Sequence, residues 1–183
     1  MLQITGITVI HVIWEGPFSM TAALSRCLEN DYGLYQIYGT HPVFGQDALL
    51  RIGQANGRTF FGSLPWYQGH WEQWEPDRYN VYLGRLGGWE PVDDNRWGVL
   101  IDNAEAITIF NVSPPYNSSR ITSMNVKEPT LVLNHERRHR LPKCLSNLNE
   151  LVDLHDGAFK LYGPPGHPIP PPEAIKEELP SST

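Results

Sequence analysis

The residue whose type and position most clearly suggest a chemical role is Glu105, which lies in a segment from residue 96 to residue 112. This segment predicts a helix that ends before Pro114 and Pro115, because proline lacks the N–H that a helix needs. Its mostly apolar stripe at helical spacing is formed by Ile101, Thr108, Ile109 and Val112. Glu105 falls on this stripe, where a carboxylate must be desolvated, paired or bound to a metal. The alternative is a glutamate that snorkels to the edge of the stripe or pairs with an arginine.

A second group of chemically useful side chains is the basic run from His135 to Lys143. If these cations are functional, they contact phosphates and position a nucleic acid without reading its bases. The residues concerned are Arg137, Arg138, Arg140 and Lys143. The alternative is an ordinary solvated face, because charge runs are often only exposed. His135 and His139 have the spacing of a zinc pair, but the surrounding positive charge would repel a cation and argues against zinc.

Residues 32–53 predict two neighbouring antiparallel strands around a loop that contains proline and glycine. In the first strand, Tyr35 and Ile37 would share one face, because side chains alternate along a strand. Gly33 and Gly53 mark positions where the backbone needs a positive φ or a close approach of other atoms. This strand pair is the frame on which the remaining elements are expected to build.

The two strands also carry a family resemblance. Gly33-Leu34-Tyr35 and Arg51-Ile52-Gly53 resemble the paired signature of the GIY-YIG nuclease superfamily, in which the second motif begins with tyrosine. The stretch from Glu105 to Asn117 resembles the family's helix with its metal-binding glutamate, followed by a proline turn and an asparagine. The resemblance covers roughly residues 30–120. It implies an α/β domain of the α+β type, with a small mixed or antiparallel three-stranded central sheet flanked by helices.

The resemblance implies metal-dependent cleavage of DNA at phosphodiester bonds. Glu105 would hold Mg²⁺ or Mn²⁺, Tyr35 would activate the attacking water and Asn117 would brace the site by hydrogen bonds. A phenol with its ordinary pKa near ~10 is a poor base, so the site would have to lower that pKa. Arg51 and Arg58 would stabilise the charge on the phosphate.

Two positions depart from the family pattern. Arg51 replaces the second tyrosine and cannot act as a base, because an arginine pKa lies above ~12. Ser63 stands where the family has a helix arginine, so Arg51 or Arg58 would have to supply the missing positive charge. The alternative function is therefore a catalytically impaired module of the same fold that binds nucleic acid or a protein.

Composition sets further limits. The chain has 183 residues, of which 40% are hydrophobic, and this suits one folded domain with appendages. The net charge of −6 argues mildly against nucleic-acid binding, since phosphate neutralisation needs basic residues.

No apolar run approaches the ~20 residues of a membrane span, and the N-terminus lacks a signal-peptide pattern. The two cysteines predict reduced, mostly buried thiols and a cytoplasmic location. The expected partner is double-stranded DNA, and no membrane partner is expected. The oligomeric state stays open, with a homodimer as one option.

The chain divides into four predicted parts, namely 1–29, 30–120, 121–162 and 163–183. The first is an addition that covers one edge of the sheet, with a strand, a turn over Trp14–Phe18 and a helix over Ser19–Leu28. The second is the nuclease-like core, which includes a strand at Tyr79–Leu86. The third is an addition with a short strand at Thr130–Asn134. The fourth is a proline-rich tail that is expected to be disordered.

Overall fold

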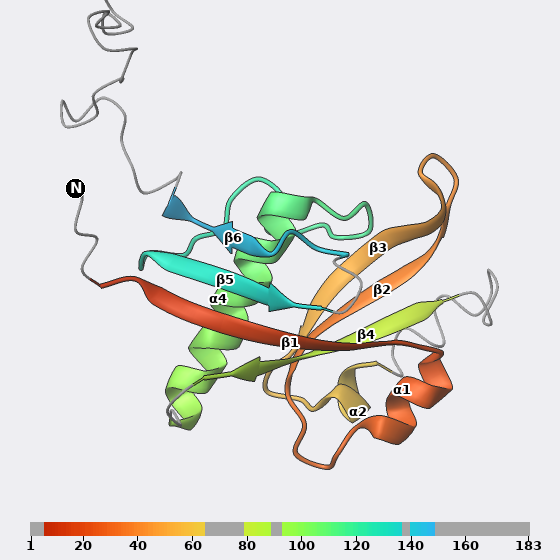
Figure 1. Cartoon of the computed structure of the whole chain (residues 1–183), viewed down its shortest axis with the longest axis horizontal. Helices are drawn as coiled ribbons and strands as arrows, with labels where there is room; N and C mark the ends of the chain where they lie inside the picture. Colours follow the sequence, from red (N-terminus) through yellow and green to blue (C-terminus); the bar gives the residue numbers. More distant parts are fainter. Residues whose placement is uncertain (1–5, 65–78, 89–92, 137–139, 149–183) are drawn as a thin grey trace, which may run out of the picture. The chain divides into compact units, whose positions relative to one another are not determined.

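The computed structural model describes residues 6–64, 79–88, 93–136 and 140–148, which belong to one unit that spans Met1–Asn149. These residues form a mixed sheet with helices on its faces (Figure 1). The strands are β1 (Thr8–Phe18), β2 (Gly33–His41), β3 (Gly45–Ala55), β4 (Asn80–Gly87), β5 (Thr130–His135) and β6 (Cys144–Ser146). Their order is β3-β2-β4-β1-β5-β6, and only the β1–β5 pair is parallel. The sheet therefore has six strands among the described residues. The mixed α/β class agrees with the prediction, but the three-stranded sheet does not.

β1 occupies a central place that the sequence did not predict. It continues through Trp14–Phe18, where a turn was expected, and pairs with β4 on one side and β5 on the other. Its side chains alternate, with Ile10, Val12 and Trp14 buried and Val9 and Ile13 exposed. The sheet thus crosses the boundaries predicted near residues 29 and 120, because strands from all three regions share one hydrogen-bonded ladder.

The helices begin at well-defined caps. The Asp93 side chain accepts a hydrogen bond from the backbone of Arg96 at the start of α4 (Asp94–Val112). Ser113, with a left-handed φ of 49°, ends this helix before the proline pair. Ser19 caps α1 (Met20–Arg26), and Thr59 caps the single turn of α2 (Phe60–Ser63). Each of the helices predicted from sequence is therefore present, with small shifts of its ends.

The core lies in two layers, one on each face of the sheet. On one face, the layer between the sheet and α4 includes Ile10, Val12, Leu34, Ile52 and Leu86 of the strands and Ile101 and Ile107 of the helix. On the other face, the layer between the sheet and α1 and α2 includes Tyr35, Ile37 and Leu83 of the strands, Met20 and Ala23 of α1, Phe60 of α2 and the following Leu64. Figure 1 shows α4 crossing one side of the sheet, with α1 and α2 away from it. Consecutive side chains of β2 are buried on alternate faces, which places Tyr35 in the second layer and Leu34 in the first.

Three further predictions concern the C-terminal tail, the two cysteines and membrane-spanning helices. Residues 149–183, which include the predicted tail, lie outside the described residues. Cys27 is half-buried and Cys144 is exposed, and both are free thiols, so the expectation of mostly buried cysteines was wrong for Cys144. None of the helices within the described ranges is long and apolar enough to cross a membrane.

Candidate functional site

The predicted site residues gather around one stretch of β3, an outer strand of the sheet. The outward-facing backbone of this strand is covered by the loop that follows α4. The Tyr116 N–H donates to the Leu50 carbonyl at 3.0 Å. The Asn117 amide then accepts from the Ile52 N–H at 3.0 Å and donates to the Ile52 carbonyl at 2.8 Å. Asn117 therefore braces this region by hydrogen bonds and closes an edge that would otherwise expose unpaired backbone groups.

Tyr35 approaches the same stretch of β3 from the α1/α2 face. It is directly paired with Gly53 across the β2–β3 ladder and is 3% exposed. A Cβ atom on Gly53 would lie 2.2 Å from the Tyr35 hydroxyl oxygen, so only glycine fits beneath this ring. The close approach predicted at Gly53 is thus confirmed, and its cause is the phenol. At Gly33 the φ is +150°, and a Cβ there would lie 2.1 Å from the Gly84 carbonyl oxygen.

Glu105 reaches β3 from α4, on the opposite face from Tyr35. Its side chain is buried, and its carboxylate accepts a hydrogen bond from the Gln54 backbone. Arg120 contributes the nearest cation, with its Nε 3.3 Å from Oε2 of Glu105. Burial raises the pKa of Glu105 to about 7, although Arg120 opposes this rise. Asp102 raises the pKa further, and Arg51 lowers it. The carboxyl group is consequently able to exchange a proton near neutral pH.

Arg120 and Asp102 were missed by the sequence analysis. The Arg120 guanidinium also binds Asp102 at 2.5 Å, and the Gln54 side chain donates to the same carboxylate at 3.1 Å. Asp102 lies three residues before Glu105, so both carboxylates lie on one side of the helix. That spacing was available in the sequence. The approach of Arg120 was not, because it depends on the fold of the loop after α4, where Arg120 has a left-handed φ of 64°.

The two arginines proposed from sequence have different positions. Arg51 is half-buried, donates from Nη1 to the Tyr116 carbonyl at 2.7 Å and acts electrostatically on Glu105. Arg58 is exposed in the turn between β3 and α2, and Ser63 lies in α2. The fold therefore brings Arg51 to Glu105, whereas Arg58 lies on the side of the sheet that α2 covers.

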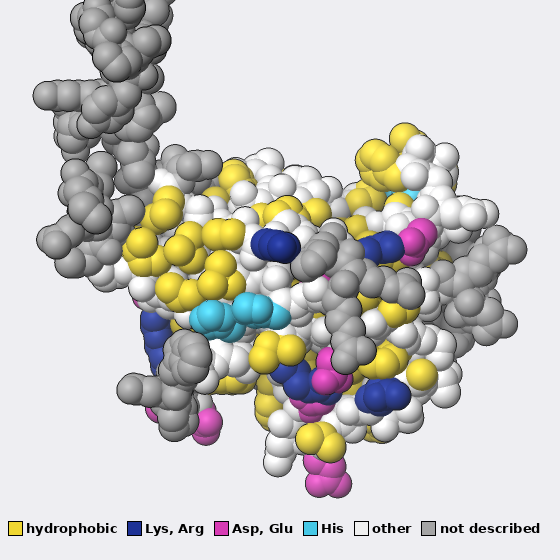
Figure 2. Space-filling view, in the orientation of Figure 1, with side chains coloured by type: hydrophobic (Ala, Val, Ile, Leu, Met, Phe, Trp, Pro, Cys, Tyr) yellow, Lys and Arg dark blue, Asp and Glu magenta, His cyan; other side chains and the backbone are white. Residues whose placement is uncertain are grey.

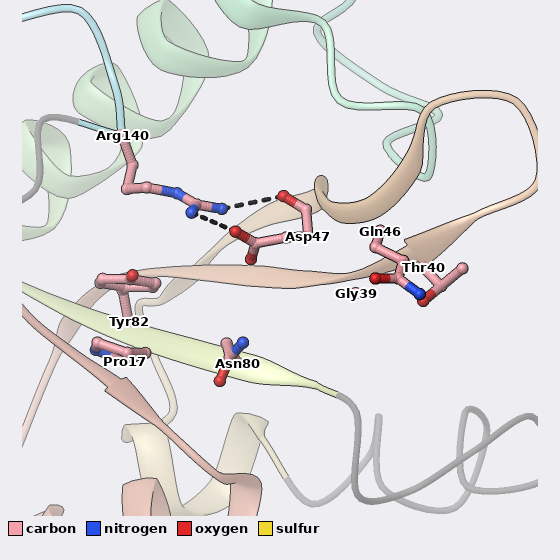
Figure 3. Close-up of a pocket in the computed structure, with 8 residues that line it drawn as sticks. All are labelled: Pro17, Gly39, Thr40, Gln46, Asp47, Asn80, Tyr82 and Arg140. Atoms are coloured by element: carbon pink, nitrogen blue, oxygen red, sulfur yellow. Dashed lines mark hydrogen bonds and ion pairs between the residues drawn. The ribbon is translucent and has the colours of Figure 1, made fainter.

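The basic run is described only in part. Arg137 and Arg138 lie outside the described residues, and Lys143 is exposed just before β6. Arg140 donates to the Asp47 carboxylate at 2.6 Å and to the Asp47 carbonyl at 3.0 Å (Figure 3). Its guanidinium also lies 4.0 Å from the ring centroid of Tyr38. Arg140 therefore ties its segment to the β2–β3 hairpin, at the wall of a cavity of about 400 Å³.

The comparison with known proteins identifies no relative of this chain. No protein-family model matches the chain, and no curated protein or solved structure is significantly similar to it. The interpretation of the site therefore rests on the residues and their geometry. We call the group formed by Tyr35, Arg51, Glu105, Asn117 and Arg120 the β3 edge site.

The oxygen donors of this site suit a hard divalent cation. Mg²⁺ takes one or two carboxylates and completes its shell with waters and phosphate oxygens, a set that Glu105 and Asp102 can begin. The Arg120 guanidinium forms ion pairs with both carboxylates. A cation that binds to Glu105 and Asp102 must therefore displace this guanidinium from Glu105. Within the described ranges, no group of three or more His, Cys, Asp or Glu side chains is arranged to hold a metal. A cation at this place would therefore have at most Asp102 and Glu105 as carboxylate ligands among the described residues.

Proposed function

We propose that this protein is a metal-dependent endonuclease that hydrolyses phosphodiester bonds of double-stranded DNA at the β3 edge site. One observation carries the proposal: Tyr35, Glu105 and Asn117, far apart in the sequence, each contact one residue of the stretch 52–54 of β3, next to Arg51 of the same strand. Of these three, Glu105 is the residue whose pKa Arg51 lowers, which places the carboxylate and this guanidinium in one electrostatic group.

Each side chain has a role that suits its position. Mg²⁺ or Mn²⁺, when bound, supplies Lewis-acid stabilisation of the charge that develops on the phosphate. Glu105 would hold the cation through its carboxylate, whose hydrogen bond from the Gln54 backbone fixes the direction of one oxygen. The Tyr35 hydroxyl lies against Gly53, buried on the opposite face of the sheet from Glu105. In this proposal Tyr35 therefore acts only through the β3 backbone that it positions, and not on the attacking water.

The positive charge of the missing helix arginine is supplied by two other residues in this proposal. Arg51 clamps a phosphate oxygen next to Glu105. Arg120, which now pairs with Glu105 and Asp102, would be available to a phosphate if a cation took its place at Glu105, since a guanidinium binds carboxylate and phosphate with the same geometry. Arg58, the alternative to Arg51 for this charge, is exposed in the turn between β3 and α2 and is not among the groups that act on Glu105.

The second candidate function is a module that binds nucleic acid or protein without cleaving it. The ion pair between Glu105 and Arg120 favours this candidate, because the carboxylate already has a cationic partner. The net charge of −6 points the same way for a protein ligand. Asn117 is equally useful to both candidates, because it closes the β3 edge in either case.

The deciding experiment is cleavage of supercoiled plasmid with Mg²⁺ or Mn²⁺ by the full chain and by paired variants. Glu105→Gln should lower the cleavage rate by about a hundred-fold or more, whereas Glu128→Gln, at a carboxylate outside the site, should leave it nearly unchanged. Tyr35→Phe should cause a smaller loss, because its hydroxyl acts only through the β3 backbone, whereas Tyr38→Phe, a buried tyrosine of the same strand, should cause none.

The outcomes separate the two functions. Nicking that requires the cation and Glu105, and that Tyr35→Phe weakens less, would establish the nuclease. A native protein that shifts DNA in a gel without cutting it would establish the binding module. Cleavage that survives both substitutions would show that the β3 edge site is not the catalytic centre.

A further inference from the structure

The hairpin between β2 and β3 ends in exposed apolar and aromatic side chains that the core does not use. Val43 is 79% exposed and Phe44 is 65% exposed at its tip. Figure 2 shows hydrophobic side chains gathered at this tip, at the upper right, where the hairpin of Figure 1 projects from the sheet. Apolar groups that remain exposed on a projecting element mark surfaces for interaction.

The tip is held in one conformation by its own hydrogen bonds. Nδ1 of His41 accepts from the backbone N–H groups of Val43 at 3.1 Å and Phe44 at 3.2 Å. The His41 and Phe44 rings are nearly parallel, at 27°, with their centroids 4.8 Å apart. Gly45, with a φ of +81°, begins the return strand. A ring that is ordered in advance loses little conformational entropy when a flat ligand stacks on it.

The aromatic side chains continue from the tip to the β3 edge site. The His41 ring lies 5.4 Å from the ring of Tyr116, which is 41% exposed. The backbone of Tyr116 is fixed to β3, since its carbonyl accepts from Arg51 and its N–H donates to Leu50. Phe44, His41 and Tyr116 thus form an aromatic row that runs along the hairpin and ends beside a guanidinium of the site.

We propose that this aromatic row stacks nucleobases that leave the duplex beside the phosphate at Arg51, an assignment that rests on the proposed function. Two features favour nucleobases over an apolar partner. The row is narrow and carries an imidazole and a phenol, which suit a flat polar ring better than a broad hydrophobic surface. Its inner end meets a cation that can take the phosphate of the same strand. Stacking of this kind tolerates any sequence, because every base has a π-face.

The test uses the full chain and a single-stranded oligonucleotide that contains 2-aminopurine, in EDTA so that cleavage cannot occur. Stacking of the probe on the row should change its fluorescence on binding. Phe44→Ala should weaken binding by about ten-fold, and Phe44→Tyr should restore it. Phe61→Ala is the matched control, because Phe61 is 62% exposed in α2, away from the row, and its loss should leave binding unchanged. The exposure of both phenylalanines predicts that all three variants keep the melting temperature of the native protein.

Failure of this proposal is distinguishable from failure of the nuclease. Probe binding that depends on Phe44 supports the row even if no plasmid is cut. Plasmid cleavage that depends on Glu105, with probe binding indifferent to Phe44, overturns the row and keeps the nuclease. Absence of probe binding also overturns it. Concentration-dependent self-association that Phe44→Ala abolishes, without an effect on the probe, would assign the tip to a second copy of the chain and overturn the proposal.

Discussion

Glu105 lies in α4, Glu128 contacts the same helix, and each pairs with an arginine. Their surroundings nevertheless shift the pKa values of the two carboxyl groups in opposite directions. Glu128 accepts hydrogen bonds from two nitrogens of Arg96, at 2.9 and 3.0 Å, and others from Thr8 and Asn103. The pKa of Glu128 is lowered, chiefly by the hydrogen bonds from Arg96. Its charged form is thus stabilised, as expected of a carboxylate with a structural role.

Glu105 has the less favourable environment. It faces a single arginine nitrogen at 3.3 Å, lies close to a second carboxylate and is more deeply buried. The pKa is raised to about 7, with burial as the main cause. The difference teaches that an ion pair alone does not identify a structural glutamate. A carboxylate that stays poorly compensated in the folded state is typical of a functional position.

The largest expected effect concerns stability as a function of pH. The pKa of Glu105 is about 7 in the folded chain, against an ordinary value of 4.5, so the folded state holds this proton more tightly than the unfolded state. Stability from this group is therefore present below pH 4.5 and is lost as the pH rises through 7. At 1.36 kcal/mol per pH unit the loss amounts to roughly 3 kcal/mol. Glu105→Gln should remove this dependence, so that the variant becomes more stable than the native protein at pH 8.

Urea unfolding of both proteins between pH 4 and pH 8 measures this difference. If the two free energies of unfolding change in parallel over that range, Glu105 is charged at ordinary pH in the folded state. The comparison with Glu128 then loses its basis.

A somewhat smaller effect of opposite sign is expected at Glu128. Glu128→Gln should lower the free energy of unfolding by about 1 kcal/mol at pH 7, because the hydrogen bonds to Arg96 are lost and solvent screens this partly exposed pair. The pKa of Glu128 is lowered in the folded state, so its contribution is present above the unfolded pKa and disappears as the pH falls. Thermal or urea unfolding at pH 7 and pH 3 should show a difference between variant and native protein only at pH 7. A Glu128→Gln protein as stable as the native one at pH 7 would contradict this assignment.

The smallest effect is a change in the pKa of Glu105 itself. Arg120 lowers that pKa, so Arg120→Gln should raise it by about one pH unit. Titration of the Glu105 side-chain carboxyl by ¹³C NMR reports this directly. Arg96→Gln serves as the control, since its partner is Glu128 and the Glu105 titration should not move. Equal shifts in both variants would mean that the effect arises from general destabilisation and not from the local ion pair.

Local sequence patterns predicted many of the elements. The helix that became α4 was predicted from its apolar stripe and its proline stop, and the α1 helix was predicted near its Ser19 cap. These signals are local, because capping and helix termination depend on neighbouring residues. The strands that became β4 and β5 were also predicted within one or two residues of their ends.

The arrangement of the strands was beyond the reach of these patterns. β1 has the alternation of a half-buried strand whether it lies at an edge or in the centre, so only its pairing with β4 and β5 decides its place. The same holds for the predicted turn at Trp14–Phe18, where β1 stays paired with β4 but changes register between Glu15 and Phe18. The six-stranded sheet follows from contacts between residues up to about 120 positions apart, which no local pattern encodes.

The sequence by itself determined that Glu105 would lie on the apolar stripe of a helix, and that Gly53 would need either a positive φ or a close neighbour. These conclusions follow from periodicity and from the steric properties of glycine, whereas Asn117 was singled out only by the family resemblance. Only the tertiary structure decided which groups meet them: the Tyr35 ring on Gly53, the Ile52 backbone at Asn117, and Arg120 at Glu105 in place of a helix arginine. The physical reason is that a buried charge requires a partner, but the nearest suitable cation is set by how distant segments pack.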